Sequence, residues 1–152
     1  IYGPTISNSF KIFDISREEN KTDISIAATH NAYLDRFGYL HKRLIKILKK
    51  NGDIMGTDSL IKKKNISNAA NYSIRFHIYP GVNVVQTVSG KSILLQVSKN
   101  KSWIFLSENQ DLQIEKGLFL GRNKVLNNHC IVIYGNTKNQ NTDVKWELRK
   151  SN

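Results

Sequence analysis

Apolar and polar residues alternate through most of the second half of the chain. In residues 72–79, Ile74, Phe76 and Ile78 fall on one face and Arg75 on the other, which is the pattern of a half-buried β-strand. Similar runs, rich in β-branched and aromatic residues, occupy residues 82–88, 91–98, 102–107, 112–116, 129–134 and 143–148. Strands that recur about every 8–12 residues with turn signals between them are typical of a sandwich or barrel. We therefore predict an all-β fold, an antiparallel β-sandwich.

The first half of the chain is less regular. Residues 10–15 and 22–27 have the alternation of strands, and the charged segment 17–21 separates them. Residues 61–71 contain three consecutive lysines and several small polar residues, so we expect an exposed loop there. No repeat of about 20–50 residues is visible, which argues against a solenoid or propeller.

Residues 40–50 allow two interpretations. The spacing of their leucines and isoleucines fits one face of a helix. However, Asn51-Gly52 follows at once, and this dipeptide is the strongest short-range signal for a β-hairpin. Residues 53–58 would then form the returning strand. We favour the hairpin.

The composition fits a single domain spanning residues 1–152. One cysteine in the chain excludes an intrachain disulfide framework and a cysteine-based zinc cluster. No apolar run approaches the ~20 residues that a membrane span needs. The chain begins with Ile1, and no charged-then-apolar signal segment opens it. We therefore expect either a processed chain or a piece of a longer one, with the β-sandwich complete or incomplete.

The charge balance is strongly basic. Lysine and arginine number 23 against 12 acidic residues, and the net charge of +11 favours polyanions such as nucleic acid, anionic lipid or acidic polysaccharide. Only six of the 23 are arginine, and dispersed lysines usually form a solvated surface. Exposed aromatic residues interleaved with arginine along one strand, the stacking platform for single-stranded nucleic acid, are not evident. No specific nucleic-acid partner is therefore predicted.

Well-known catalytic and metal-binding motifs do not occur in the sequence, including glycine-rich phosphate loops and the common zinc-protease and esterase signatures. Cys130 lies in the apolar run 130–133, so we predict a small buried hydrophobic residue rather than a nucleophile. The four histidines lack the close spacing of many metal sites. We predict no metal ligand and no cofactor in this chain.

The densest cluster of polar and aromatic side chains lies in residues 28–43, where two histidines, two tyrosines, two arginines and one aspartate surround Gly38. Aromatic and cationic groups close together suit sugar faces and carboxylates or sulfates. The alternative is a loop and a strand whose tyrosines pack and whose charges are solvated. The polar face of residues 72–79 adds further basic side chains, although a histidine there also fits an ordinary surface residue. The candidate substrate-binding residues are His30, Tyr33, His41, Arg43, Arg75 and His77.

The order of several short motifs points to a family. The motifs are His30-Asn31-Ala32-Tyr33, Phe37-Gly38, His41-Lys42-Arg43, Asn51-Gly52-Asp53, Gly56-Thr57-Asp58, residues 75–82, residues 101–105 and Val144-Lys145-Trp146. With this set and order, over about residues 9–149, the chain resembles the C-terminal region of heparinase II/III-like proteins of Gram-negative bacteria. It departs from them where Asn-Ala replaces the Asp-Gly of their first motif.

The resemblance implies a domain organisation and a set of partners. Proteins of this family are polysaccharide lyases that combine an N-terminal α-toroid with a β-sandwich. The toroid carries the catalytic tyrosine and much of the acid/base apparatus, and a metal-binding His/Asp set lies near the start of the β-domain; this chain matches neither. By resemblance it is the later part of the sandwich and holds no catalytic residue. Its implied partners are an anionic polysaccharide and the missing toroid domain, in the periplasm or cell envelope of a Gram-negative bacterium.

The function implied is a share in a lyase reaction. A base removes the proton at C5 of a uronic acid, and the neighbouring carboxylate must be neutralised as the enolate-like intermediate forms. The basic strands of the sandwich would supply part of that neutralisation or hold the anionic chain across the cleft, and the domain alone would be inactive. Two alternatives stay open. One is a non-catalytic carbohydrate- or polyanion-binding β-domain, and the other is a support for the missing domain that touches no ligand.

Overall fold

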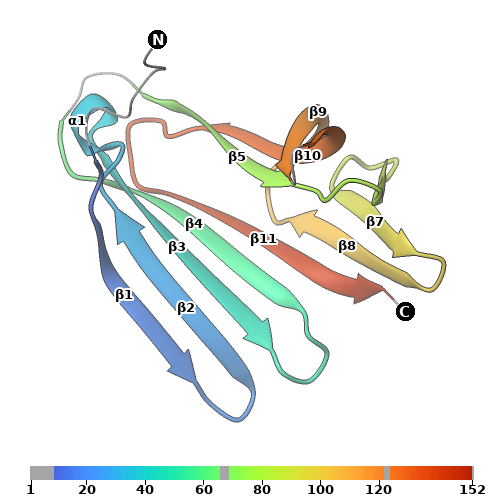
Figure 1. Ribbon diagram of the computed structural model, residues 1–152. Helices are drawn as coiled ribbons and strands as arrows, with labels where there is room; N and C mark the ends of the chain where they lie inside the picture. The colour runs from blue at the N-terminus through green and yellow to red at the C-terminus, as the bar shows by residue number, and fades with distance from the viewer. Residues whose placement is uncertain (1–8, 66–68, 122–123, 152) are drawn as a thin grey trace.

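Eleven β-strands and one short helix make up the part of the chain that the structure describes, residues 9–65, 69–121 and 124–151 of a computed structural model (Figure 1). In chain order they are β1 (Ile12–Glu19), β2 (Asp23–His30), α1 (Leu34–Phe37), β3 (Tyr39–Leu48), β4 (Ile54–Lys62), β5 (Asn71–His77), β6 (Asn83–Gln86), β7 (Ser92–Ser98), β8 (Lys101–Ser107), β9 (Leu112–Gly121), β10 (Lys124–Asn136) and β11 (Thr142–Ser151). Every strand pair is antiparallel, which confirms the predicted all-β class.

The strands form two sheets of unequal size. The large sheet has the order β1-β2-β3-β4-β11-β8-β7-β6, and the small sheet has the order β5-β10-β9. Figure 1 shows the small sheet over one end of the large sheet, with β1 and β2 at the other end. Strand β11, the last in the chain, lies between β4 and β8. It therefore joins the hairpins of the first half of the sequence to those of the second half.

The core lies between the two sheets where they overlap. Its fully buried members include Ile93 on the large sheet and Ile131 and Ile133 on the small sheet. The ring of Trp146 stacks on that of Phe105 with the ring centroids 5.9 Å apart. Phe76 of the small sheet packs against both rings, with its centroid 4.7 Å from that of Phe105 and 4.9 Å from that of Trp146. Alternate side chains from two facing sheets thus interdigitate, as the two-residue period of the second half predicts.

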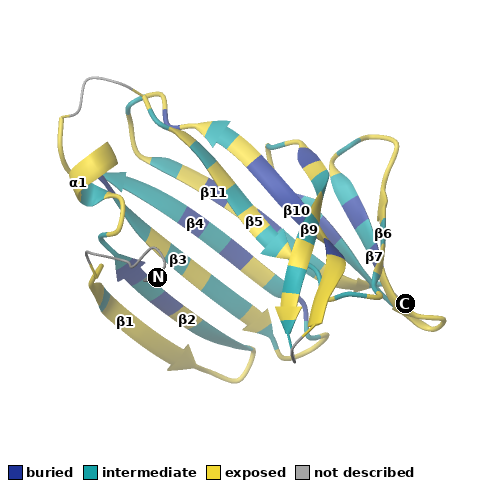
Figure 2. Cartoon of the chain, turned by 45° about the horizontal axis from the view of Figure 1, so that its top comes forward, coloured by how far each residue is buried: buried dark blue, intermediate teal, exposed yellow. Residues whose placement is uncertain are grey.

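Strands β1, β2 and β3 extend beyond the small sheet, and we call them the uncovered wing (Figure 2). Among the described residues, none of the wing belongs to the buried core cluster. Ile26, Ile45, Gly56 and Trp146 are directly opposite one another across β2, β3, β4 and β11, so they share one face of the sheet. On that face Trp146 is 9% exposed and Ile26 is 48% exposed. The same face is therefore dry at one end of the sheet and open at the other.

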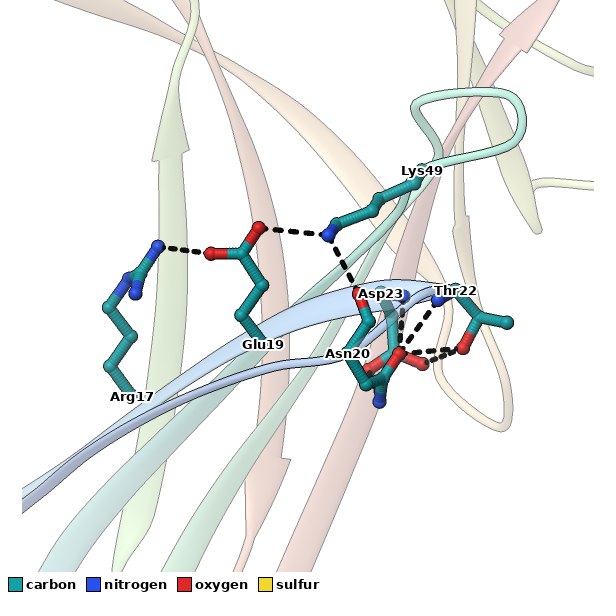
Figure 3. Close-up of polar contacts among 6 residues, drawn as sticks. All are labelled: Arg17, Glu19, Asn20, Thr22, Asp23 and Lys49. Atoms are coloured by element: carbon teal, nitrogen blue, oxygen red, sulfur yellow. Dashed lines mark hydrogen bonds and ion pairs between the residues drawn. The ribbon is translucent and has the colours of Figure 1, made fainter.

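Exposed polar contacts close the far end of the wing (Figure 3). Asn20 Oδ1 accepts hydrogen bonds from the backbone N–H groups of Thr22 and Asp23 at 2.8 and 2.9 Å, which fixes the turn between β1 and β2. Lys49, just after β3, donates to Glu19 Oε1 at 2.8 Å and to the backbone oxygen of Asn20 at 2.7 Å. These contacts tie the ends of three strands together without burying apolar surface.

The ambiguous segment 40–50 is a strand, as we favoured. Strands β3 and β4 pair as a hairpin, and Gly52 in the turn has a φ of 78°, a conformation that glycine adopts without strain. The loop predicted over 61–71 is shorter than expected, because β4 and β5 extend into its two ends. Residues 66–68 within it lie outside the described part of the chain.

Three further segments differ from the prediction. Strand β1 runs to Glu19, so most of the charged segment 17–21 is strand rather than loop. Strands β9 and β10 form a much longer hairpin than the predicted 112–116 and 129–134, and the helix α1 was not predicted. The extra residues of these elements are mostly exposed. None of these extra residues belongs to the buried core cluster of the described chain, so burial gives little signal for where these elements end.

Cys130 is 2% exposed, which confirms the prediction of a small buried residue. It is the single cysteine of the chain and carries a free thiol. None of the helices in the described residues is long and apolar enough to cross a membrane.

Candidate functional site

A cavity of about 460 Å³ lies where the uncovered wing meets the small sheet. Its walls come from β2, β3 and β4, from the turn and helix before β3, and from the edge strand β5, with one residue each from β11 and from the turn after β10. The lining brings together five of the six residues that the sequence singled out: His30, Tyr33, His41, Arg43 and Arg75. Side chains more than 40 positions apart in the sequence therefore share one site.

His77 lies apart from these five residues. It follows Arg75 by two positions on β5, is exposed, and does not line the cavity. The sequence correctly placed both on the polar face of their strand, with Phe76 turned toward the core. Residues 71–75 of that strand line the cavity, and its last two residues extend past it.

Strand register places a cationic side chain next to a buried carboxylate. Arg43 is directly opposite Asp58 across β3 and β4, and Asp58 is 2% exposed. Gly56, two residues earlier, leaves room for the ring of Trp146, since a Cβ there would lie 2.1 Å from the indole Cε2. The indole Nε1 then donates to Asp58 Oδ2 at 2.8 Å. The Gly-x-Asp motif thus has a physical reason: the glycine seats the indole that the aspartate binds.

Asp58 is the centre of the polar lining. Its Oδ1 accepts hydrogen bonds from His41 Nε2 and from Arg43 Nε, each at 2.7 Å, while Oδ2 accepts the bond from Trp146. Burial by itself would raise the pKa of Asp58, but the three donors outweigh it and hold the pKa below its ordinary value of 3.8. The carboxylate is therefore ionised and acts as a fixed negative charge beneath the cavity.

The two histidines form a line that ends on this carboxylate. His30 Nε2 and His41 Nδ1 are 2.8 Å apart, and the backbone N–H of Ala32 donates to His30 Nδ1 at 3.2 Å. Because an ionised carboxylate only accepts, His41 carries a proton on Nε2. Because His30 Nδ1 accepts from the Ala32 N–H, His30 carries its proton on Nε2 and donates it to His41 Nδ1. All three bonds then run in one direction, with both rings neutral. Burial, followed by the repulsion that a protonated His41 and the Arg43 guanidinium would exert on a second positive charge, lowers the pKa of His30 and favours this neutral form.

The two arginines of the cavity are held differently. Arg43 binds Asp58 through Nε alone, and its side chain is 38% exposed. Its two terminal nitrogens have no hydrogen-bond partner among the residues that the structure describes. Arg75 is paired instead with Glu115 Oε2 at 2.6 Å and with Tyr134 Oη at 3.2 Å. Arg43 is therefore the cation with the greater capacity to bind a carboxylate or sulfate in bidentate fashion.

Aromatic side chains lie at the outer rim. Tyr33 is 44% exposed, and its ring centroid lies 5.3 Å from that of His30. Phe37 on α1 is 39% exposed, with its ring centroid 6.5 Å from that of Tyr33. The helix ends at Gly38, whose φ of 80° turns the chain directly into β3. The turn thus presents two exposed rings beside cationic groups, an arrangement that suits the face of a sugar ring.

Asp58 is the residue of this site that the list of sequence candidates missed. One signal for it was present, because a hairpin turning at Asn51-Gly52 brings Arg43 opposite Asp58. Its contact with Trp146 spans 88 positions and had no local signal.

The polar side chains of the cavity are engaged with one another. Nowhere in residues 9–65, 69–121 and 124–151 do three or more His, Cys, Asp or Glu side chains gather so that they could hold a metal ion. Both ring nitrogens of His41 are already engaged, one by His30 and one by Asp58. These groups are arranged in a line rather than around a common centre, which does not fit metal coordination.

Comparisons with known proteins give a consistent result. The family described as "Heparinase II/III-like, C-terminal" matches residues 7–147. The crystal structure of heparan sulfate lyase HepC from Pedobacter heparinus has a TM-score of 0.78 at 14% identity, over 93% of this chain and 22% of that chain. A crystal structure of heparinase III has a TM-score of 0.70 at 14% identity, over 95% of this chain and 21% of that chain. This chain therefore spans about a fifth of their length, and no curated protein matches it.

Proposed function

The chain belongs to the heparinase II/III-like family, in which it corresponds to the C-terminal region, and we propose that it forms one wall of the substrate cleft of a polysaccharide lyase. The lyase cleaves uronic-acid-containing anionic polysaccharide by β-elimination. The observation that carries this proposal is the cavity cation Arg43, which is anchored by one nitrogen and has two nitrogens without a partner among the described residues.

The chemistry of β-elimination requires such a cation. Removal of the proton at C5 leaves negative charge on a carboxylate that is already anionic, so a positive group at the carboxylate lowers the barrier. A guanidinium matches the two carboxylate oxygens in geometry and stays charged at any working pH. Arg43 is also fixed in place before the substrate arrives, because Asp58 holds its Nε at 2.7 Å.

The other cavity residues have supporting roles in this proposal. Tyr33 provides an exposed ring for a sugar face, and His30 and His41 add polar groups beside the anion. Arg75 contributes from the facing strand, and His77 extends its basic face beyond the cavity and stays a predicted contact. The residues that abstract and return protons belong to another domain of the lyase, so the chain alone is inactive.

The uncovered wing supports a place within a larger protein. Ile12, Ile26 and Ile47 are 57%, 48% and 36% exposed, which is unfavourable for a free-standing surface. The N-terminal α-toroid domain of the lyase is the partner that we propose for this region. Action on an extracellular anionic glycan would place the protein in the periplasm or cell envelope of a Gram-negative bacterium.

Substitution of Arg43 in the intact protein tests the proposal. Arg43→Gln is expected to lower kcat/KM on a uronic-acid polysaccharide by about 10–100-fold, the equivalent of losing one charged hydrogen-bonded contact. Arg43→Lys keeps the charge but loses the two parallel N–H donors of the guanidinium, so its kcat/KM should lie between those of Arg43→Gln and the wild type. Arg149→Gln is the matched control, since Arg149 is an exposed arginine of β11 that does not line the cavity.

Two results would separate the alternatives. Equal loss of activity in Arg43→Gln and Arg149→Gln would exclude a specific contact and leave only general electrostatic attraction. Binding of uronic-acid polysaccharide and single-stranded DNA with equal affinity at matched salt, without any lyase activity, would favour a non-catalytic polyanion-binding domain.

A further inference from the structure

The line from Ala32 through His30 and His41 to Asp58 has one place where a proton can be added. In the neutral line each histidine carries hydrogen on Nε2, and each of these hydrogens lies in a bond to the next group. Placing a hydrogen on His41 Nδ1 alone would set two N–H groups against each other across 2.8 Å. The acceptable protonated forms therefore both carry the new hydrogen on His30 Nδ1.

Protonation of the line has an identifiable cost. His30 Nδ1 loses its role as acceptor for the Ala32 N–H, which it bonds at 3.2 Å. The positive charge then lies either on His30 or, if the inner proton shifts along the bond, on His41 beside Asp58. Both positions are close to the Arg43 guanidinium, which binds the same Asp58 oxygen as His41. Repulsion from Arg43 thus opposes the added charge.

The groups around His30 are those of the cavity lining and of β1. Besides three tyrosines, the titratable and charged groups are His41, Arg43, Asp58 and Arg75. Strand β1 contributes Ile12 directly opposite His30, which is apolar. Asp58 is already shared by three donors, and Arg75 is paired with Glu115 outside the cavity. None of these groups offers an unshared negative charge, so a further anion in the cavity would stabilise the added proton.

We propose that the cavity binds one carboxylate or sulfate group beside Arg43 and that the His30–His41 pair takes up one proton from solvent as it binds. This inference rests on the proposed function and adds the coupling between the anion and the proton. Arg43 supplies the fixed positive charge, and the histidine pair supplies a second one only when the anion is present. Asp58 holds both in place and stays ionised throughout, and no covalent bond forms or breaks.

The coupling has a defined sign. Burial, followed by the repulsion that a protonated His41 and Arg43 would exert, lowers the pKa of His30, and a bound anion raises the proton affinity of the pair toward or above its ordinary range. At pH values between the pKa of the free pair and its pKa with the anion bound, the affinity for the anion rises as pH falls, by up to about tenfold per pH unit. A uronate stays ionised over this pH range, since carboxyl groups titrate at about pH 4.

Calorimetric titration of the intact protein measures this proton directly. The probe is the unsaturated uronate-containing disaccharide that a lyase releases, which cannot be cleaved again. Titrations at one pH near 6.5, in two buffers of different ionisation enthalpy, give the number of protons taken up. We expect uptake of a measurable fraction of one proton, and an affinity that increases between pH 8 and pH 6.

Two variants identify the group that takes up the proton. His30→Gln should abolish the proton uptake and flatten the pH dependence of the affinity between pH 8 and pH 6. His129→Gln is the control, because His129 is an exposed histidine on β10 outside the cavity, and it should behave as the wild type. Circular dichroism and thermal unfolding of each variant verify that the fold is kept.

The outcomes separate this inference from the proposed function. Binding without proton uptake, or uptake that persists in His30→Gln, would overturn the coupling and leave the function standing. No binding of the disaccharide at any pH, together with unchanged turnover of polysaccharide by Arg43→Gln, would overturn the anion site and the proposed function together.

Discussion

The two ends of the eight-stranded sheet follow the same alternation but meet different surroundings. At one end, β11, β8 and β7 lie under the small sheet, and residues such as Ile93 are fully buried. At the other end, the wing presents Ile26 on the same face at 48% exposure. A sequence pattern therefore sets which side chains share a face. Whether that face becomes a core depends on a second layer.

The cavity lies on the boundary between these two ends, and the position explains its chemistry. Asp58 on β4 is close enough to the core to be desolvated and to bind the Trp146 indole. Arg43, one strand further out, keeps part of its side chain in solvent. A fixed buried anion thus holds a partly exposed cation. Neither the dry end nor the open end of the sheet alone provides this combination.

The largest expected effect comes from the same substitution at two isoleucines, one in the core and one in the wing. Ile133→Ala in the core is expected to lower the free energy of unfolding by about 2–5 kcal/mol, through lost burial and the cavity left behind. Ile26→Ala in the wing should cost about 1 kcal/mol in the same 152-residue chain, because its side chain is half exposed. Urea denaturation of both variants measures the difference. Equal losses would mean that the wing is as well covered as the core.

The same substitution in the intact protein tests whether another domain covers the wing. If the proposed partner domain covers the wing, Ile26→Ala should there cost more than in the isolated chain and approach the value for Ile133→Ala. If Ile26→Ala lowers the free energy of unfolding of the intact protein by no more than that of the isolated chain, the partner domain does not cover this face.

Much of the fold could be predicted from the sequence where one face of each strand is buried. The segment 72–79 carries the clearest alternation, and its apolar positions pack against the core. The limits of β1, β9 and β10 were less predictable, because their exposed residues carry no burial signal. The hairpin at residues 40–58 was decided by its turn, since the spacing of its leucines and isoleucines also fits a helix.

Most of the predicted site residues do line the cavity, but Asp58, which binds three side chains, was not among them. The cluster in residues 28–43 supplied six of the cavity residues, four of them predicted candidates, because a turn between adjacent strands keeps them together. The bond from Trp146 to Asp58 depends on β11 inserting next to β4, which is a property of the sheet order. Local patterns do not specify that order.

Asp58 provides the second largest expected effect. Asp58→Asn removes the negative charge that Arg43 binds. It also places the amide N–H₂ group against one of the three N–H donors that the carboxylate accepts. We therefore expect a loss of about 1–3 kcal/mol in the free energy of unfolding. Asp143→Asn on the neighbouring strand β11 is the control, because Asp143 is exposed. A loss no greater than that of the control, measured by urea denaturation, would contradict the role of Asp58.

The pH dependence of stability gives a smaller effect. His30 has a pKa lowered below 6.5 in the folded chain, so the folded state binds fewer protons than the unfolded state. Its contribution to stability is present above pH 6.5 and decreases as pH falls from there through the folded pKa. His30→Gln should remove this part of the slope in unfolding experiments between pH 7.5 and pH 5. An identical slope in the variant would contradict the neutral histidine pair.

The tip of the wing should matter least. Lys49→Ala removes the contacts to Glu19 and Asn20, but both lie at the surface, where such contacts are weak and screened by salt. The unfolding midpoint is expected to stay within experimental error. A clear loss of stability that disappears at high salt would show that the tip contributes more than its exposure indicates.

The most direct test of the central claim is a crystal structure of the intact protein with a uronic-acid oligosaccharide bound. We predict a carboxylate or sulfate oxygen within hydrogen-bond distance of the terminal nitrogens of Arg43, with a sugar ring near Tyr33. An oligosaccharide bound elsewhere, with the cavity filled by side chains of another domain, would contradict the claim and leave this region a structural support.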